Sequence, residues 1–349
     1  MSSPSSMPGL DQTALTRLHA ALDGRRAIIT GGAGFIGGHL AETLLTLGFN
    51  VCIVDDLSTG DGDRAASLVE NHAPRARFVH ASVLDARSLD DAMERAAIVF
   101  HLAAVASVGE SMEHPERAID VNVRGTVEVC QAARAAGAKR VILASSCAVY
   151  GDAGGQHVPE DAPLAPISPY AASKAAGELI LGAWARSLGI DGVSLRLFNV
   201  YGPRQSGDSE ESAVIAAFAS RLAAGRPPVI YGDGTQTRDF IYVDDVVRAM
   251  LLAAAAPEPF SGEAINIGAG APTEIRTLAS EMARAWGRGA LAPEHGPARP
   301  GDILHSGADT THAEKRLSFR AATSLQQGLR SLAAWAGDSS HTPDSAITR

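Results

Sequence analysis

The fold of this chain is decided by one stretch, Ala27-Ile28-Ile29-Thr30-Gly31-Gly32-Ala33-Gly34-Phe35-Ile36-Gly37. A β-branched run precedes the glycines and a helical stretch over 38–47 follows them, which predicts a strand, a tight turn and a helix in succession. Gly31 would permit the turn, Gly34 would let backbone amides approach a pyrophosphate, and Gly37 would let helix and strand pack closely. The stretch therefore predicts a dinucleotide-binding loop.

The second predicted strand, over 51–54, ends at Asp55 and Asp56, about 20 residues beyond the glycines. An acid at this position accepts hydrogen bonds from the adenosine ribose, and Asp55 would repel a 2′-phosphate, so NAD is favoured over NADP. His101, after the fourth strand, is interpreted as a core histidine without a chemical role. The remaining positions expected to line the cofactor are Phe35, Ile36, Ser82, Val83, Leu102, Ala103, Ala104 and Asn122.

Short β-branched runs alternate with alanine-rich helical stretches from residue 25 to about residue 200. The strand candidates lie over 27–30, 51–54, 77–79, 98–100, 141–143 and 192–195. This alternation predicts an α/β fold, a Rossmann-type doubly wound parallel sheet with helices on both faces. Beyond Tyr201 the elements shorten and Pro and Gly become more frequent, which predicts a smaller C-terminal α/β substrate-binding lobe.

The expected organisation has four parts. Residues 1–24 form an N-terminal extension whose apolar stripe from Leu10 to Leu22 predicts a short helix, packed on the body or on a partner. Residues 25–200 form the NAD-binding domain, to which 239–256 returns. The smaller lobe comprises 201–238 and 257–336, and 337–349 is expected to be a flexible tail.

Composition excludes several classes of function. The formal charge is −9, with no basic run, which argues against nucleic acid and anionic membrane as partners. No apolar run approaches the length of a membrane span, and the N-terminus lacks the pattern of a secretory signal. Cys52, Cys130 and Cys147 are scattered, so we expect reduced thiols in a cytoplasmic protein, with no disulfide framework and no metal site.

The candidate catalytic residues are Ser146, Tyr170 and Lys174. In Ser-Pro-Tyr-Ala-Ala-Ser-Lys the phenol lies four residues before the ammonium, so a helix would place both on one face. A nearby positive charge favours the phenolate and lowers its pKa toward working pH, which predicts that Tyr170 is a general base. Ser146 follows the fifth strand, where its hydroxyl can meet the nicotinamide and the phenol. Tyr170 and Lys174 are also expected to contact the cofactor.

Taken together, Thr-Gly-x-x-Gly-x-x-Gly, Asp55, Ser-Ser-x-x-Val-Tyr-Gly and Tyr-x-x-x-Lys make residues 25–336 resemble the extended short-chain dehydrogenase/reductase superfamily. More narrowly, the chain is similar to the NAD-dependent epimerase/dehydratase family and its UDP-glucose 4-epimerase group. The segments 196–204, 231–240 and 299–302 resemble the family's substrate-binding segments, with Phe198 and Val200 on the cofactor. The resemblance implies substrate contacts from Ser107, Ser146, Tyr170, Asn199, Tyr231, Arg238, Arg299, Asp302 and Ser306.

The resemblance also narrows the reaction. Relatives that dehydrate carry an acidic pair after the catalytic hydroxyl residue, and sugar-acid decarboxylases usually carry a glutamate there, whereas this chain has Cys147 and Ala148. C4 epimerisation of a UDP-hexose through a transient 4-keto sugar is therefore implied, with NAD staying bound between turnovers. Ser306 stands where relatives confined to plain hexoses often carry tyrosine, which implies that UDP-GlcNAc and UDP-GalNAc are admitted beside UDP-Glc and UDP-Gal.

Alternatives stay open at this point. The enzyme could be a UDP-glucuronate 4-epimerase, or another nucleotide-sugar epimerase or reductase of the same superfamily. A non-catalytic dinucleotide-sensing protein is disfavoured, because such regulators typically lose the tyrosine or the lysine. Ala106 replaces a lysine that some relatives place near the cofactor diphosphate, so the grip on the cofactor could be looser. The resemblance further implies a homodimer, formed through helices over 116–136 and 171–187.

Overall fold

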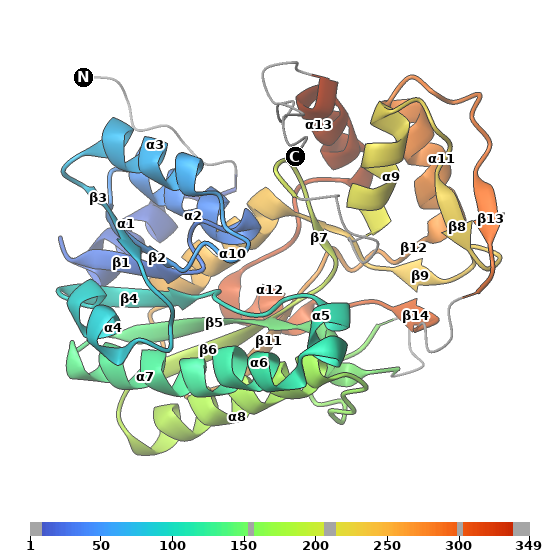
Figure 1. The fold of residues 1–349 in the computed structure, drawn as a ribbon. Coiled ribbons are helices and arrows are strands. Elements are labelled where there is room, and N and C mark those ends of the chain that lie inside the picture. Colours follow the sequence, from blue (N-terminus) through green and yellow to red (C-terminus); the bar gives the residue numbers. More distant parts are fainter. Residues whose placement is uncertain (1–8, 153–156, 206–213, 299–302, 338–349) are drawn as a thin grey trace.

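The strand that leads into the glycine loop is β1 (Arg26–Thr30), which is buried from Ala27 onward. The computed structural model describes residues 9–152, 157–205, 214–298 and 303–337. Within them, seven strands form one parallel sheet in the order β11-β6-β5-β4-β1-β2-β3 (Figure 1). Their bounds are β2 Asn50–Asp55, β3 Ala76–His80, β4 Ala96–His101, β5 Arg140–Ser146, β6 Asp191–Leu197 and β11 Ala264–Ile267. The predicted doubly wound sheet is confirmed, and every predicted strand lies in it.

Helices cover both faces of this sheet (Figure 1). One face packs against α1 (Gln12–Leu22), α2 (Phe35–Thr46), α3 (Gly62–His72) and α10 (Val243–Ala255). The other face packs against α4 (Ala86–Ala92), α7 (Gly125–Ala135) and α8 (Pro169–Ser187). Because both faces are covered, the strands carry nearly continuous apolar runs and not a clean alternation of apolar and polar residues.

The helix predicted in the N-terminal extension is α1, and it packs on the body of the protein. Asp11 caps it, because its carboxylate accepts a hydrogen bond from the Ala14 amide at 2.7 Å. The helix contacts α10, and its Leu18 and Leu22 side chains are buried in the core on this face of the sheet. The choice left open by the sequence is thus resolved in favour of packing within the chain.

The long helix predicted over 116–136 is interrupted in the structure. The chain passes through α5 (Val108–Glu113), α6 (Pro115–Ile119) and a π-helical turn, η1 (Asp120–Arg124), before α7 begins. Single π-helical turns often occur at functional positions. Here the turn carries Asn122, whose buried side chain reaches the segment that follows β4.

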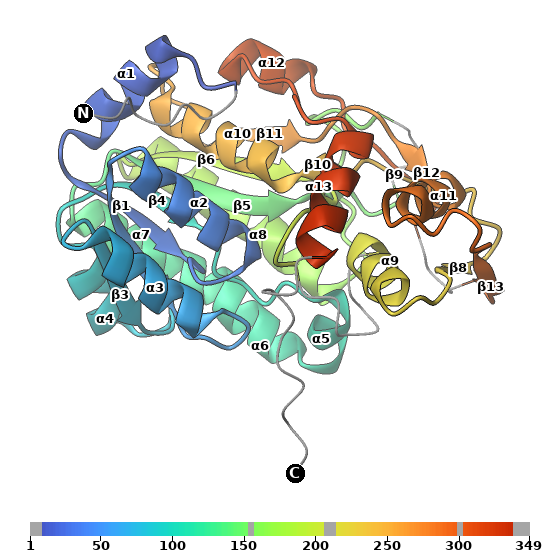
Figure 2. The same ribbon diagram turned by 90° about the horizontal axis from the view of Figure 1, so that it is seen from above.

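The smaller lobe lies beyond the carboxyl ends of the strands (Figures 1 and 2). Its buried core includes Phe218, Ile230, Leu278, Met282 and Leu329. The elements from Val200 onward, other than α10 and β11, are β7 Val200–Tyr201, α9 Val214–Ala223, β8 Val229–Tyr231, β9 Thr237–Arg238, β10 Ile241–Tyr242, β12 Thr273–Glu274, α11 Ile275–Ala285, β13 Glu294–Gly296, β14 His305–Ser306, α12 Thr311–Leu317 and α13 Leu325–Gly337. No helix of the described residues is long and apolar enough to cross a membrane.

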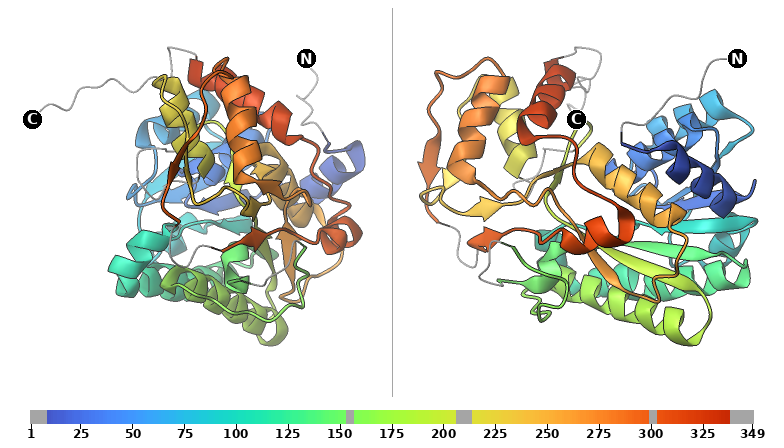
Figure 3. Two further views of the ribbon diagram at one scale, coloured as in Figure 1. Left: turned by 90° about the vertical axis from the view of Figure 1, so that its right-hand side faces the viewer. Right: turned by 180° about the vertical axis from the view of Figure 1, so that it is seen from behind.

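The boundary predicted for the lobe needs correction. The sequence pattern places residues 257–336 in the lobe, but β11 hydrogen-bonds to β6 at the edge of the main sheet. Helix α12 packs on β11 and α10, and Figure 3 shows it beside the main sheet, away from α9 and α11. The sequence therefore does not reveal that the chain returns to the main sheet through β11 and α12. Four-residue β11 is too short to stand out among short loop elements.

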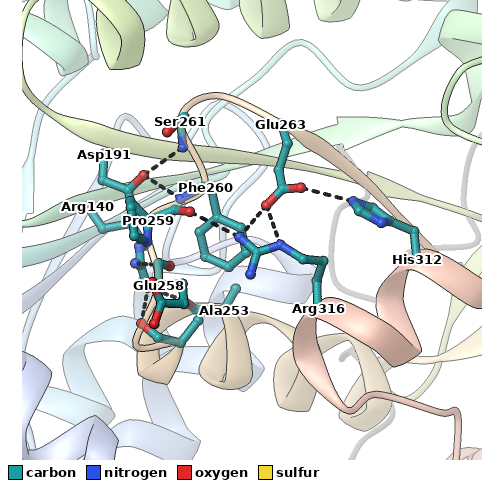
Figure 4. A network of polar contacts seen from close by, with 11 residues as sticks. Arg140, Asp191, Ala253, Glu258, Pro259, Phe260, Ser261, Glu263, His312 and Arg316 are labelled. Carbon is teal, nitrogen blue, oxygen red and sulfur yellow. Dashed lines mark hydrogen bonds and ion pairs between the residues drawn. The ribbon is translucent and has the colours of Figure 1, made fainter.

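A network of polar contacts at the amino ends of β5 and β6 holds this return in place (Figure 4). The Arg140 guanidinium bonds Asp191 at 2.5 Å and donates to the carbonyls of Ala253 at 2.6 Å and Ala256 at 3.0 Å. These carbonyls end α10, where a positive charge is favourable. Arg316 of α12 binds Glu263, directly before β11, at 2.7 Å. The network thus joins β5, β6, α10, β11 and α12.

Candidate active site

The glycine loop between β1 and α2 has a shape that fits a dinucleotide. Gly31 has φ +69°, and a Cβ there would stand 2.6 Å from the Ala103 amide nitrogen. A Cβ on Gly37 would overlap with the Gly31 carbonyl oxygen. Helix α2 begins after Gly34 without a side-chain cap, so the amides of its first turn are left to an anionic ligand. Phe35 and Ile36 are the first residues of that turn.

Asp55 lies at the carboxyl end of β2 beside this loop. Its carboxylate is buried and accepts hydrogen bonds from the amides of Ala33 and Leu57, each at 2.9 Å. Burial raises the pKa of Asp55, and these two hydrogen bonds oppose the rise. Each oxygen keeps a further lone pair that can receive a ribose hydroxyl. The neighbouring Asp56 instead accepts from the Ser58 amide at 3.0 Å and is exposed.

The other cofactor positions predicted from the sequence follow β3 and β4. Leu102 donates its amide hydrogen to the Thr30 carbonyl at 3.0 Å, which places residues 102–104 against the glycine loop. Val83 is buried, and Ser82 accepts from the Leu84 amide at 3.2 Å. These segments meet at the carboxyl end of the sheet, where doubly wound folds bind their ligands.

Asn122 and His101 support this region through buried hydrogen bonds. Asn122 accepts from the Val105 amide at 2.8 Å and donates to the Val105 carbonyl at 3.0 Å and to Ser173 at 2.8 Å. His101 is buried between Thr30 at 2.7 Å and Thr126 at 3.1 Å, and burial lowers its pKa to about 3. Both side chains therefore brace the strand ends, and His101 has the environment of a core histidine.

The three candidate catalytic residues come together at the end of β5. Helix α8 starts at Pro169 and is capped by Ser168, so Tyr170 lies in its first turn and Lys174 one turn later. The Ser146 hydroxyl adjoins the Tyr170 phenol and acts to lower the phenol pKa. The Lys174 ammonium donates to the Ala144 carbonyl at 2.8 Å and lies 5.9 Å from the centre of the Tyr170 ring.

The electrostatics of Tyr170 differ from the expectation. The spacing to Lys174 predicts a lowered phenol pKa, but burial raises the pKa of Tyr170 to about 12, against the opposing hydrogen bond from Ser146. Burial also lowers the pKa of Lys174 to about 8. A low-polarity site disfavours every charged form, and the ammonium bonds a carbonyl oxygen instead of the phenol. The protein part of the site alone therefore does not produce a phenolate.

The substrate side of the site is assembled by the lobe. Ser306 of β14 pairs directly with Arg238 of β9, and the Ser306 hydroxyl lies 4.0 Å from the Cys147 sulfur. Asn199 donates to the Asp239 carbonyl at 3.1 Å. Three of the residues predicted to bind the substrate, Asn199, Arg238 and Ser306, therefore lie near the turn that follows Ser146, although they are far apart in sequence.

Other predicted substrate residues are less directly placed. Ser107 caps α5, accepting from the Glu110 amide at 3.0 Å, and Tyr231 is 39% exposed on β8. Phe198 is buried and Val200 half-buried between β6 and the lobe. Arg299 and Asp302 lie outside the described residues. Among the described residues, no group of three or more His, Cys, Asp or Glu side chains could hold a metal ion.

Sequence reasoning missed the buried charges around the site. Asp239 is fully buried, and its carboxylate accepts from the amides of Ala269, Gly270 and Ala308, which fixes β9 against β14. Glu178 and Arg196 form a second buried pair behind Lys174. The signal available for Glu178 was its place four residues after Lys174, on the same helix face.

Comparison with known proteins agrees with this geometry. A family model described as "NAD dependent epimerase/dehydratase family" matches residues 27–268. The chain is 39% identical to a UDP-glucose 4-epimerase of Mycolicibacterium smegmatis, over 87% of this chain and 96% of the relative. It is similar to the UDP-N-acetylglucosamine 4-epimerase from Methanobrevibacter ruminantium in complex with UDP-N-acetylmuramic acid, at 36% identity and TM-score 0.83, covering 89% and 97% of the two chains. A third similar structure, the UDP-glucose 4-epimerase of Thermus thermophilus in complex with NAD, shares 35% identity at TM-score 0.79, covering 90% and 99%.

The chain therefore belongs to the NAD-dependent epimerase/dehydratase family. It is an enzyme of the NAD-dependent epimerase type, and NAD is its cofactor. The glycine loop, the uncapped start of α2 and the buried Asp55 carboxylate are the parts of this chain that fit that cofactor.

Proposed function

We propose that this enzyme interconverts the C4 epimers of a UDP-hexose, UDP-Glc with UDP-Gal, and accepts UDP-GlcNAc and UDP-GalNAc. One observation carries the proposal: Tyr170, Lys174 and Ser146 come together at the end of β5, and Ser146 is followed by Cys147 and Ala148 instead of acids. The relative from Mycolicibacterium smegmatis and the similar structure from Methanobrevibacter ruminantium, both named as UDP-sugar 4-epimerases, support the proposal.

In the proposed mechanism, Tyr170 takes the proton of the sugar 4-hydroxyl at its phenolic oxygen and later returns one. Ser146 holds the substrate oxygen and the phenol in one hydrogen-bonded line. Lys174 lies on the same helix face and provides positive charge within 6 Å of the ring centre. Held by the glycine loop and Asp55, NAD would supply the group that takes up the C4 hydride and gives it back, together with the positive charge of its oxidised nicotinamide. Such a charge would offset the cost of burying a phenolate.

Epimerisation is favoured over elimination because neither of the two residues that follow Ser146 is a carboxylic acid. Burial raises the pKa of the Cys147 thiol, so the side chain after Ser146 stays neutral, and Ala148 has no ionisable group. A dehydration would need a base to remove a carbon-bound proton and an acid for the leaving water. Without a carboxylate at these two positions, the 4-keto sugar is expected to turn over in the pocket and take the hydride back on its other face.

Substrate binding is proposed to use Ser107, Asn199, Tyr231, Arg238, Arg299, Asp302 and Ser306 beside the catalytic residues. Arginine suits the diphosphate because its planar fork binds phosphate oxygens in pairs. Ser306 is small, and its hydroxyl contacts the small Cys147 side chain, which leaves room for an acetamido group. Room for an acetamido group at C2 does not decide which group is accepted at C6, so UDP-glucuronate is included in the test.

The deciding experiment incubates purified enzyme separately with UDP-Glc, UDP-GlcNAc and UDP-GlcA and separates the products by chromatography. We expect C4 epimers of the first two, without net consumption of added NAD. Epimerisation of UDP-GlcA alone would reassign the substrate. A 4-keto-6-deoxy product or release of carbon dioxide would overturn the proposed reaction.

We also propose that the enzyme is a homodimer of the cytoplasm. The helices expected at the dimer contact carry large exposed apolar side chains, Ile119 on α6 and Leu179 on α8, exposed by 46% and 65%. Three free cysteines agree with a reducing compartment. Sedimentation equilibrium should give twice the chain mass, and Leu179→Glu should give the mass of one chain. A monomeric wild-type protein would refute the dimer.

A further inference from the structure

The catalytic face of α8 continues one turn beyond Lys174, to Glu178. A spacing of four residues places all three side chains on the side that packs against β5. Each of these three side chains contacts a different one of the last three residues of that strand. The contacts join Tyr170 to Ser146, Lys174 to the Ala144 carbonyl, and Glu178 to the Ser145 hydroxyl at 2.5 Å.

Glu178 is also one half of a buried ion pair. Arg196 of β6 binds its carboxylate through Nε at 3.0 Å and through Nη2 at 2.8 Å, and the two side chains are only 7% and 6% exposed. The third guanidinium nitrogen of Arg196 donates to the Tyr150 hydroxyl at 2.8 Å. That hydroxyl in turn donates to Asn266 of β11 at 2.7 Å. One ion pair thus anchors α8 to the ends of two neighbouring strands.

We propose that Glu178 and Arg196 are positioning residues: their pair holds α8 in register with the ends of β5 and β6, and the Glu178 carboxylate keeps Lys174 charged beside Tyr170. The inference rests on the proposed function, since it assumes that Tyr170 and Lys174 carry the acid–base work. Neither residue needs to touch the substrate for this role.

The charges around Lys174 support an electrostatic role for Glu178. Burial lowers the pKa of Lys174 to about 8, and the Glu178 carboxylate acts in the opposite direction. His101 is neutral because burial lowers its pKa to about 3, and burial raises the pKa of each nearby phenol and thiol. Among the described residues, Glu178 is the charged group that acts on the pKa of Lys174, and His101 is close enough for Lys174 to lower the pKa of its ring. Arg196, the partner of Glu178, is the next charged group behind it.

Removing one charge of the pair at a time should move the pH dependence in opposite directions. Glu178→Gln leaves the Arg196 guanidinium unbalanced, so Lys174 loses its proton at lower pH. The pH above which kcat for UDP-Glc falls should then decrease by about one unit. Arg196→Gln leaves the carboxylate unbalanced and should raise that pH by a similar amount. Arg196→Lys keeps the positive charge, so the pH above which kcat falls should stay unchanged.

A role limited to packing predicts a different result. It would lower kcat in both single variants at every pH without moving the alkaline limb, and that outcome would overturn the electrostatic part of the inference. Ser145→Ala keeps both charges and removes only the hydroxyl that donates to Glu178. It should reduce kcat several-fold with no shift of the limb, and unchanged kcat would overturn the positioning part.

A second readout needs no substrate. The folded-state pKa of Lys174 is depressed, so its burial costs stability below about pH 8, and stability rises with pH from there toward the pKa of an unfolded lysine. Urea unfolding, referenced to Lys174→Met, reports the pH at which this rise begins. It should begin at lower pH in Glu178→Gln and at higher pH in Arg196→Gln. A common onset in all variants would overturn the inference. Absence of UDP-hexose turnover in the wild-type enzyme would instead count against the proposed function.

Discussion

A single added carbon at Gly31 tests how the cofactor loop is built. Its φ of +69° costs a residue with a side chain about 1 to 2 kcal/mol. A Cβ would also stand 2.6 Å from the Ala103 nitrogen and 2.8 Å from the Leu102 carbonyl carbon. The two backbone segments must therefore separate by roughly 0.7 Å to reach ordinary contact. We expect Gly31→Ala to lose about 2 to 4 kcal/mol of unfolding free energy and to be purified without NAD.

Gly137→Ala is the matched control. Gly137 has φ +65°, and nothing lies within 4 Å of a Cβ built there, so the variant has the backbone cost without the crowding. It should lose about 1 to 2 kcal/mol and keep its NAD. Urea unfolding measures the stability, and absorbance of the denatured supernatant measures the bound NAD. Equal losses of stability and of NAD in the two variants would refute the reasoning about close approach.

Three further predictions concern the catalytic phenol, the sugar pocket and the buried network. Tyr170→Phe should lower kcat by about 10²- to 10⁴-fold while NAD stays bound, and a turnover within a few-fold of wild type would contradict the role of the phenol. Ser306→Tyr should lower kcat/KM for UDP-GlcNAc at least about tenfold relative to UDP-Glc, because the tyrosine ring would fill the space proposed for the N-acetyl group. An unchanged ratio would argue against the position proposed for the N-acetyl group beside residue 306. Arg140→Met should cost about 3 to 5 kcal/mol in urea unfolding because it removes the charged partner of the half-buried Asp191 carboxylate, which keeps only backbone amide donors. A loss below about 1 kcal/mol would mean that the network is dispensable.

Much of the fold could be predicted because its signals are local. The glycine loop needs backbone conformations that only glycine adopts readily, and each buried parallel strand is a short β-branched run. The β11 strand and α12 could not be assigned in this way. Their place in the main domain depends on Arg140, Glu263 and Arg316, whose partners lie far away in sequence.

The residues of the candidate site could be named from the sequence, but the way they are arranged could not. The spacing of Tyr170 and Lys174 is a property of one helix, so their common face follows from the sequence. The contact between Cys147 and Ser306 joins residues 159 positions apart, and no local pattern reports it. Asn122 was expected to line the cofactor, whereas the hydrogen bonds of its side chain brace Val105 and Ser173. A contact between Asn122 and NAD stays a prediction.

The chain's residues alone therefore determined which groups are available: a glycine loop, an acid after the second strand, and a tyrosine and a lysine on one helix face. Tertiary structure decided what those groups experience. Burial raises the pKa of Tyr170 and lowers that of Lys174, opposite to what their spacing implied for the phenol. The tertiary structure also pairs Glu178 with Arg196 next to Lys174. The physical reason is that spacing along a helix reports proximity, whereas the cost of charge depends on how completely the folded chain excludes water.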